Sequence, residues 1–183
     1  MGPAGVGKIS LLRAAQERLE ALGCKLAQRT ITRSTPAREE GAVEVSPSEF
    51  ENMRAKGAFA LVWHTNGLGY GIGKEIDDWL ADGYWVLVNG SREYLPKALE
   101  RYPDLQPVLV SADTAILNKR LLYRGRDSIG EIEARLARNS SFRDTQPGNT
   151  LILDNSGPLE QTVDAFIDWL KEAMASQSGD NNQ

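Results

Sequence analysis

The sequence predicts an α/β fold built around a central parallel sheet, with helices covering both of its faces. Continuous apolar runs at 85–88, 108–110 and 151–153 lack the alternation of a half-exposed strand, which is typical of parallel strands buried on both faces. Segments with a helical spacing of apolar residues separate these runs, as in chains where strand and helix alternate. The chain also opens on a glycine-rich segment directly before a helix, an arrangement that suits phosphate binding.

Apolar spacing and helix-ending residues define the individual elements. Leu12 and Leu19 recur at helical spacing, for example, and Gly23 is placed to end that first helix. We predict helices at 9–22, 47–56, 76–81, 94–102, 114–123, 131–143 and 158–173. We predict strands at 24–32, 59–63, 85–88, 108–110 and 151–153, with a charged loop at 35–41 and a glycine-rich turn at 66–71. The closing helix turns these apolar residues inward: Leu159, Val163, Phe166, Ile167 and Leu170.

Composition narrows the class of protein. The chain has 183 residues, which suits one domain, and its formal net charge of -4 offers no basic surface for nucleic acid. The single Cys24 excludes an internal disulfide and fits a reducing cytoplasm. No apolar run reaches membrane-spanning length, so we expect a cytoplasmic protein without a membrane partner. We expect one domain over residues 1–175 and a disordered polar tail over 176–183.

The first segment of the chain is a phosphate-binding loop. Gly2-Pro3-Ala4-Gly5-Val6-Gly7-Lys8 matches G-x-x-x-x-G-K, in which backbone N–H groups surround nucleotide phosphates and the lysine reaches the outer ones. Ser or Thr follows the lysine in this motif and binds magnesium, but Ile9 holds that position here and Ser10 comes one residue later. The sequence therefore predicts a nucleotide site whose magnesium contact is altered.

An arginine-rich stretch is the second candidate for chemistry. Guanidinium groups stabilise charge on a transferring phosphoryl group, and a pair that flanks a glycine between two helices suits a lid. A solvated helix face, paired with acidic neighbours, is the alternative interpretation. The phosphate loop in the same chain favours the lid. The arginines concerned are Arg120, Arg124, Arg126, Arg135 and Arg138.

A third group of residues follows the strand at 24–32. Arg33 and Arg38 suit a second phosphorylated ligand. His64, the one histidine of the chain, has three possible roles: substrate contact, general base or polar loop residue.

Together these motifs resemble the nucleoside-monophosphate kinases, and among them the guanylate-kinase-like group. The shared pieces are the phosphate loop, Thr32-Arg33, Glu49-Phe50, Tyr70-Gly71 and the arginine lid. Guanylate kinases read guanine with a glutamate at the position that falls on Leu61, so a base-reading site is not expected. Over nearly the whole chain, the sequence is more similar to the ribose 1,5-bisphosphate phosphokinases, on these stretches: 60–64 (ALVWH), 66–71 (NGLGYG), 86–92 (VLVNGSR), 124–126 (RGR) and 133–138 (EARLAR).

This resemblance implies a P-loop kinase fold with an acceptor-binding region at about 33–75 and a lid at about 123–131. It implies ATP-dependent phosphorylation of α-D-ribose 1,5-bisphosphate to 5-phosphoribosyl 1-diphosphate in organic phosphonate degradation. ATP and Mg²⁺ are the expected cofactors, the sugar bisphosphate is the expected partner, and a homodimer is left open. Expected catalytic residues are Lys8, Arg124, Arg126 and Arg135; expected ATP contacts are Gly2, Pro3, Ala4, Gly5, Val6, Gly7, Lys8, Ile9, Ser10, Arg120 and Asn155. Expected substrate contacts are Arg33, Arg38, His64, Tyr70, Asn89, Ser91, Arg92 and Arg138, and the metal contact is Ser10.

Departures from the family pattern keep two alternatives open. Ile9 cannot bind magnesium, a hard cation that needs oxygen ligands, and Gly41-Ala42 replaces a more polar pair of the acceptor site. A kinase for another phosphorylated acceptor, such as a nucleoside monophosphate, is one alternative. A catalytically weakened relative that only binds nucleotide is the other. The strand that precedes the loop in this fold is also absent from the chain, and we expect Met1 to be its last residue.

Overall fold

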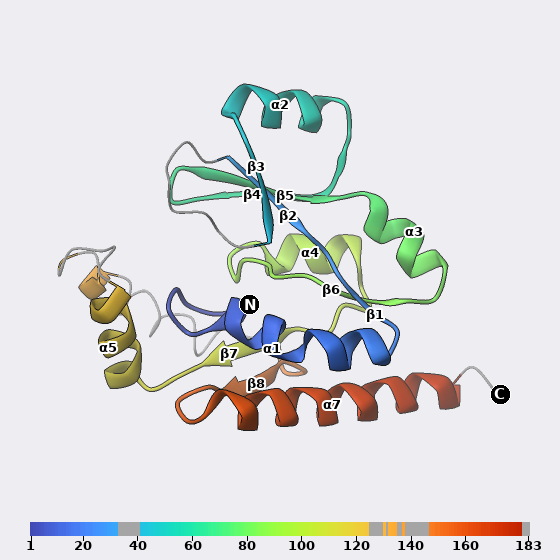
Figure 1. Cartoon of the computed structure of the whole chain (residues 1–183). Coiled ribbons are helices and arrows are strands. Elements are labelled where there is room, and N and C mark those ends of the chain that lie inside the picture. Colours follow the sequence, from blue (N-terminus) through green and yellow to red (C-terminus); the bar gives the residue numbers. More distant parts are fainter. Residues whose placement is uncertain (33–40, 125–129, 131, 135–136, 138–146, 181–183) are drawn as a thin grey trace. The chain divides into compact units, whose positions relative to one another are not determined.

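The computed structural model describes residues 1–32, 41–124, 130, 132–134, 137 and 147–180. The chain divides into two compact units, each described here by itself. The first unit comprises Met1–Arg18 and Leu99–Gln183, and the second comprises Leu19–Ala98 (Figure 1). Helix α1 (Lys8–Ala21) begins in the first unit and ends in the second.

A parallel pair of strands forms the centre of the first unit. Strand β7 (Val108–Ser111) pairs with β8 (Leu151–Asp154) in parallel, from Val108 opposite Leu151 to Ser111 opposite Asp154. Met1 extends this ladder, because its amino group donates to the Val108 carbonyl at 2.8 Å and its carbonyl accepts from the Val110 N–H at 2.9 Å. This pairing matches the strand position that the sequence predicts directly before the phosphate loop.

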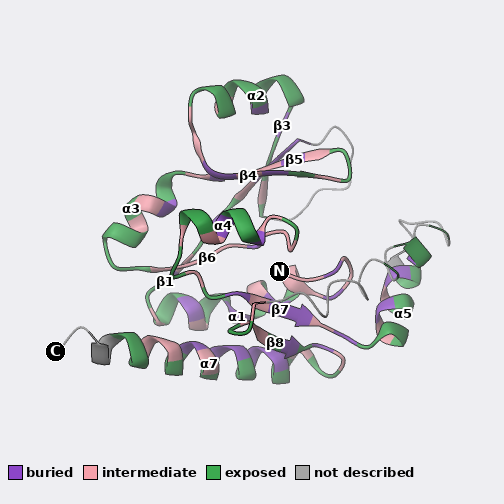
Figure 2. Cartoon of the chain, turned by 180° about the vertical axis from the view of Figure 1, so that it is seen from behind, coloured by how far each residue is buried: buried purple, intermediate pink, exposed green. Residues whose placement is uncertain are grey.

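Helices α5 (Thr114–Arg124) and α7 (Leu159–Asp180) complete the described part of this unit. One side of α7 is buried in a continuous stripe, which Figure 2 shows in purple. The apolar spacing predicts this stripe, and four of the five expected inward residues are buried: Val163, Phe166, Ile167 and Leu170. The helix continues to Asp180, past the end predicted at 173 and into the segment expected to form the tail. The predicted helix at 131–143 lies mostly outside the described residues.

The second unit contains two sheets, because the single strand predicted at 24–32 is in fact two. Strand β1 (Cys24–Leu26) pairs in parallel with β6 (Trp85–Leu87), whereas β2 (Arg29–Thr32) belongs to a four-stranded sheet of order β3-β2-β5-β4. Residues 27–28 carry the chain from one sheet to the other. Strand β3 (Ala42–Val45), which the sequence analysis missed, runs parallel to β2. The three residues of β6 are half-buried rather than fully buried as predicted, because β6 pairs within a two-stranded sheet.

The glycine-rich segment predicted as a turn is mostly a strand. Strands β4 (Phe59–Thr65) and β5 (Leu68–Gly73) form an antiparallel hairpin joined by Asn66 and Gly67 alone. Both of these residues have positive φ, 52° and 73°, as a mirror-image two-residue turn requires. Asn-Gly is the sequence signal for such a turn, and the neighbouring glycines hid it.

Helix α2 (Pro47–Ala55) packs on the four-stranded sheet through Phe50, which is fully buried. Ser46 caps this helix by accepting from the Glu49 N–H at 3.2 Å, and Gly57 follows its end. The Phe50 ring stacks on Phe59 with centroids 5.0 Å apart. Gly71 makes room for this stack, since a Cβ there would lie 2.5 Å from the Phe59 ring.

Helix α3 (Glu75–Ala81) belongs to the second unit, and α4 (Leu95–Arg101) begins in the second unit and ends in the first. Both lie close to their predicted positions. Across the described residues of both units, the helices are too short or too polar to cross a membrane.

Candidate active site

The phosphate loop leads directly into helix α1, which begins at Lys8. The Gly7 carbonyl accepts from the Leu11 N–H at 2.9 Å, which is the first turn of that helix. Backbone N–H groups at a helix N-terminus have no partner within the helix and carry a partial positive charge. The first turn of α1 contains no acidic side chain to offset that charge. The loop and helix start therefore suit an anion.

The side chain of Lys8 folds over the backbone of the loop. Its Nζ donates to the Gly2 carbonyl at 2.7 Å and to the Pro3 carbonyl at 2.8 Å. The ammonium group thus lies at the mouth of the loop and holds two of its carbonyl oxygens. This placement agrees with a lysine that interacts with phosphate oxygens of a bound nucleotide.

The carbonyl oxygen of Val6 is bound from two directions. Asn155 donates to it through Nδ2 at 2.7 Å, and Arg120 donates through Nη1 at 3.5 Å. Asn155 lies directly after β8 and is 3% exposed, whereas Arg120 lies on α5 and is half-buried. Both residues were expected to contact ATP, and the structure brings both to the backbone of the phosphate loop.

Residues next to the lysine offer little to a metal ion. Ile9, the second residue of α1, is half-buried and carries no oxygen, and Ser10 is exposed. Within the described ranges, no group of three or more His, Cys, Asp or Glu side chains is placed to hold a metal. The expected contact through Ser10 stays a prediction.

In the second unit, strand β2 and the hairpin bring a guanidinium group and two aromatic rings together. The rings of Trp63 and Tyr70 stack with centroids 5.4 Å apart and an interplanar angle of 3°. The Arg29 guanidinium lies 5.5 Å from the Tyr70 ring centroid and donates to the Asn89 carbonyl at 3.1 Å. The sequence analysis missed Arg29, although a charged residue in a strand otherwise made of Thr and Ile was a usable signal.

Asn89 begins the loop that follows β6. The residue is 8% exposed, and its Oδ1 has no hydrogen-bond partner among the described residues. Ser91 and Arg92, two further expected substrate contacts, are half-buried in the same loop. The Arg29 contact ties this loop to the strand that carries the aromatic stack. Tyr70, Asn89 and Arg29 therefore form one neighbourhood.

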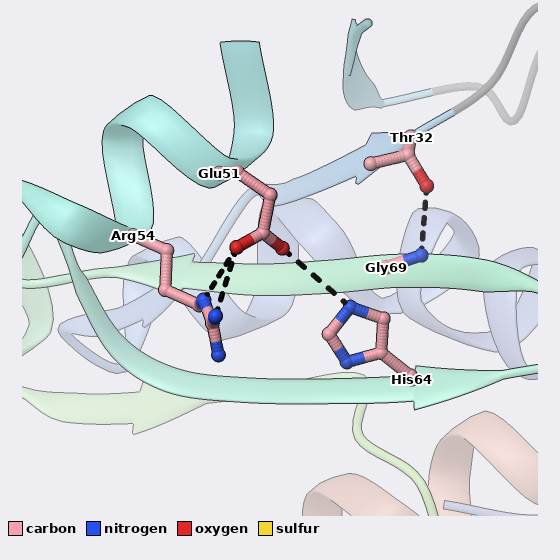
Figure 3. Close-up of polar contacts among 5 residues, drawn as sticks. All are labelled: Thr32, Glu51, Arg54, His64 and Gly69. Carbon is pink, nitrogen blue, oxygen red and sulfur yellow. Dashed lines mark hydrogen bonds and ion pairs between the residues drawn. The ribbon is translucent and has the colours of Figure 1, made fainter. Parts of the chain in front are cut away.

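His64 lies on the opposite face of the same sheet. Successive residues of a strand point to opposite faces, and Trp63 is opposite Tyr70 in the hairpin while His64 is opposite Gly69. His64 Nε2 lies 4.0 Å from Glu51 Oε1 of α2, and Glu51 also pairs with Arg54 at 2.8 Å (Figure 3). Both side chains of the His64–Glu51 pair are exposed. The structure therefore does not bring His64 to Tyr70, its expected companion.

Thr32 ties β2 to the hairpin on this second face. Its Oγ1 accepts from the Gly69 N–H at 2.7 Å in a buried hydrogen bond (Figure 3). The remaining predicted site residues lie outside the described residues or, for Arg124 at the end of α5, have an undescribed side chain: Arg33, Arg38, Arg124, Arg126, Arg135 and Arg138.

Solved structures identify the class of this fold. Guanylate kinase from Anaplasma phagocytophilum aligns with a TM-score of 0.66 at 15% identity and covers 90% of this chain and 80% of its own. A gluconokinase from Sinorhizobium meliloti aligns with a TM-score of 0.52 at 22% identity, over 97% of this chain and 94% of that one. The chain therefore has the fold of P-loop kinases, with a phosphate-loop sequence before its first helix.

Curated relatives then identify the family. Ribose 1,5-bisphosphate phosphokinase PhnN of Pseudomonas paraeruginosa is 53% identical over 170 residues, covering 93% of this chain and 92% of the relative. The protein of the same name from Azotobacter vinelandii is 49% identical over 176 residues, covering 94% and 93%. The chain belongs to the ribose 1,5-bisphosphate phosphokinase family. No family model matched the sequence.

Proposed function

We propose that this protein transfers the γ-phosphoryl group of ATP to the 1-phosphate of α-D-ribose 1,5-bisphosphate. A phosphate oxygen of the sugar forms a bond to the γ-phosphorus, the bond from that phosphorus to the β-phosphate oxygen breaks, and 5-phosphoribosyl 1-diphosphate and ADP result. The observation that carries the proposal is 53% identity over 93% of the chain to relatives that bear this name. The phosphonate-degradation role expected from the sequence is part of the proposal.

The chemistry asks for charge neutralisation rather than for a base. A phosphate monoester has a second pKa of about 6, so the attacking oxygen is largely ionised at neutral pH. Two phosphate-rich molecules must instead be held in line against their mutual repulsion. We assign the ATP phosphates to the N–H groups of loop 2–7 and to Lys8. Magnesium would offset phosphate charge, with Ser10 as its expected protein contact and its other ligands coming from phosphate and water.

We assign the acceptor to the neighbourhood of Arg29, Tyr70 and Asn89, with Ser91 and Arg92 from the same loop. Arg29 supplies a fork for phosphate oxygens, and its hydrogen bond to the Asn89 carbonyl ties it to the loop that carries Ser91 and Arg92. Buried Leu61 takes the position of the guanine-reading glutamate, which favours a sugar over a nucleotide. The position of His64 across the sheet lends its proposed substrate contact no support.

The arginines beyond the described residues complete the proposal. Arg124, Arg126 and Arg135 would stabilise the transferring phosphoryl group, and the acceptor phosphates would be held by Arg33, Arg38 and Arg138. We further propose that the enzyme acts in the cytoplasm on a small-molecule substrate, without nucleic acid. A homodimer remains part of this proposal.

An assay of purified protein with ATP, Mg²⁺ and ribose 1,5-bisphosphate tests the proposal, with products followed by ³¹P NMR. We expect a diphosphate at the sugar C1 in the wild type and a loss of about a hundredfold or more in Lys8→Met. Lys97→Met, on the exposed surface of α4, is the matched control and should keep the wild-type rate. A folded wild type that phosphorylates a nucleoside monophosphate instead, or that binds ATP without turnover, would contradict it.

A further inference from the structure

We infer that Asn155 and Thr162 are positioning residues that hold the phosphate loop in its anion-binding conformation, rather than contacts of the nucleotide base. The inference rests on nucleotide binding by this loop, as proposed above. The observations behind it are the hydrogen bonds at both ends of the buried Asn155 side-chain amide and the Val6 peptide group that this amide binds.

Both ends of the Asn155 amide are bound within the protein. Nδ2 donates to the Val6 carbonyl at 2.7 Å, and Oδ1 accepts from the Thr162 hydroxyl at 2.9 Å. The backbone N–H of Asn155 donates to the Ser111 carbonyl at 2.7 Å, which fixes the residue to β7. At 3% exposure, the side chain has no surface to offer to an adenine ring.

Thr162 holds the oxygen end of the amide. It lies in the first turn of α7 and is 4% exposed, and its hydroxyl also lies 3.2 Å from the Asp154 carbonyl. An asparagine amide can rotate to exchange its oxygen and nitrogen, and the Val6 carbonyl, which can only accept, selects the orientation in which Oδ1 accepts from Thr162. That orientation directs Nδ2 to Val6.

The held peptide determines where one loop N–H points. In a planar trans peptide, the carbonyl of one residue and the N–H of the next point in opposite directions. Because the Val6 carbonyl is turned to Asn155 and Arg120, the Gly7 N–H is turned the other way, away from both. Without these donors the peptide is free to rotate, and a carbonyl oxygen turned inward would repel a phosphate.

The close approach of Asn155 depends on glycine at position 7. A Cβ on Gly7 would lie 2.6 Å from Asn155 Nδ2, and the φ of +94° at Gly7 is unfavourable for other residues. The glycine directly before Lys8 therefore admits the amide as well as the phosphate. These contacts join the start of α7 to the loop through a single buried side chain.

The test compares a nucleotide with a phosphate chain that has no base. Calorimetry with ATP and with inorganic tripolyphosphate measures binding to the wild type, Asn155→Ala, Thr162→Val and Thr162→Ser. Loss of the shorter of the two hydrogen bonds to the buried Val6 carbonyl lowers affinity by about tenfold. We expect Asn155→Ala to weaken both ligands by that factor, Thr162→Val to weaken both less, and Thr162→Ser to restore wild-type affinity. In steady-state assays, KM for ATP should rise while KM for the acceptor stays the same.

A double variant tests whether Thr162 affects the phosphate loop only through Asn155. In the Asn155→Ala background, Thr162→Val should cause no further loss, because Thr162 acts only through the amide. Ser156→Ala is the matched control, since it removes the hydroxyl contacts of Asp113 and Asp154 in the same turn and leaves Asn155 intact. It should bind both ligands as the wild type does.

Three results would overturn the inference. ATP weakened with tripolyphosphate unchanged would assign Asn155 to the base, and additive losses in the double variant would separate the two residues. Unchanged binding in every variant would leave the amide without a role in the loop. A wild type that binds neither ligand would instead refute the proposed function on which the inference rests. If Asn155→Ala does not fold, the comparison of Thr162→Val with Thr162→Ser still tests the inference.

Discussion

The ring of Trp63 lies parallel to that of Tyr70, with their centroids 5.4 Å apart across the β4–β5 hairpin. Tyr94 adds a third ring at 5.7 Å from Trp63, and Arg29 lies over Tyr70. Cross-strand aromatic pairs stabilise a sheet by roughly 0.5–1.5 kcal/mol beyond the area that they bury. The stack thus gives Arg29 a rigid surface on which to lie, and rigidity reduces the entropy that ligand binding removes.

Replacement of Arg29 by lysine should impair the acceptor more than the nucleotide. Lysine keeps the positive charge but loses the planar fork that binds phosphate and stacks on Tyr70. We expect KM for ribose 1,5-bisphosphate to rise about tenfold in Arg29→Lys, with KM for ATP unchanged. Arg54→Lys, at an exposed ion pair of α2, is the control and should leave both constants unaltered. Equal effects on the two substrates would argue against an acceptor site here.

Replacement of Ile9 by serine should reduce the magnesium that the enzyme requires. The substitution returns a hydroxyl to the position where the loop motif has one. We expect the Mg²⁺ concentration for half-maximal rate to fall, measured by titration at saturating ATP. Because Ile9 is half-buried, a loss of about 1 kcal/mol in stability accompanies the change. An unchanged magnesium requirement would show that the altered position does not limit the enzyme.

Replacement of Gly71 by alanine should destabilise the second unit without touching the phosphate loop. The new Cβ would lie 2.5 Å from the Phe59 ring, which is held in turn by its stack on Phe50. Overpacking of this kind costs about 2 kcal/mol. Urea unfolding measures the loss, and Gly148→Ala, where a Cβ meets nothing within 4 Å, is the matched control. Equal stabilities for the two variants would contradict the packing described for α2.

Cys24 should react slowly with thiol reagents in the folded protein. Burial raises the pKa of the Cys24 thiol, and only the thiolate is nucleophilic. We expect Ellman's reagent at pH 8 to react at least about tenfold more slowly with folded protein than with protein in urea. The same shift makes stability fall above the unfolded pKa of about 8.5, where the unfolded thiol ionises and the folded one does not. A folded-state rate equal to that of free cysteine would contradict the burial.

The sequence predicts most of the first unit and less of the second. Helix α1, strands β7 and β8 and the buried stripe of α7 each carry a strong local pattern, and these elements are confirmed, although Ile152 of β8 is exposed where a strand buried on both faces was expected. Strands β2 and β3 carry no such pattern, because a strand of four residues is too short for the alternation of apolar and polar residues to be distinctive. Glycines that make room for Phe50 and Phe59 look like turn residues until the rings are placed.

The sequence predicted which residues belong to the candidate site better than it predicted which atoms they contact. Lys8 folds back on Gly2 and Pro3 within its own loop. The amide contact of Asn155, by contrast, comes from a distant chain segment, so no local pattern shows it. Neighbours in sequence were also separated: Trp63 and His64 lie on opposite faces of one sheet. No spacing rule shows which face a ligand uses until the sheet is assembled.

That separation has an evolutionary consequence. Substitutions at Arg29 and Tyr70 reach the face that we propose for the acceptor, whereas those at Thr32, His64 and Gly69 reach the face that α2 covers. Mutations that change the preferred sugar phosphate can therefore accumulate on one face of the sheet without disturbing the packing of α2 on the other face. Because every second residue of a strand lies on the same face, new acceptors can be selected through these positions while the packing on the other face is kept.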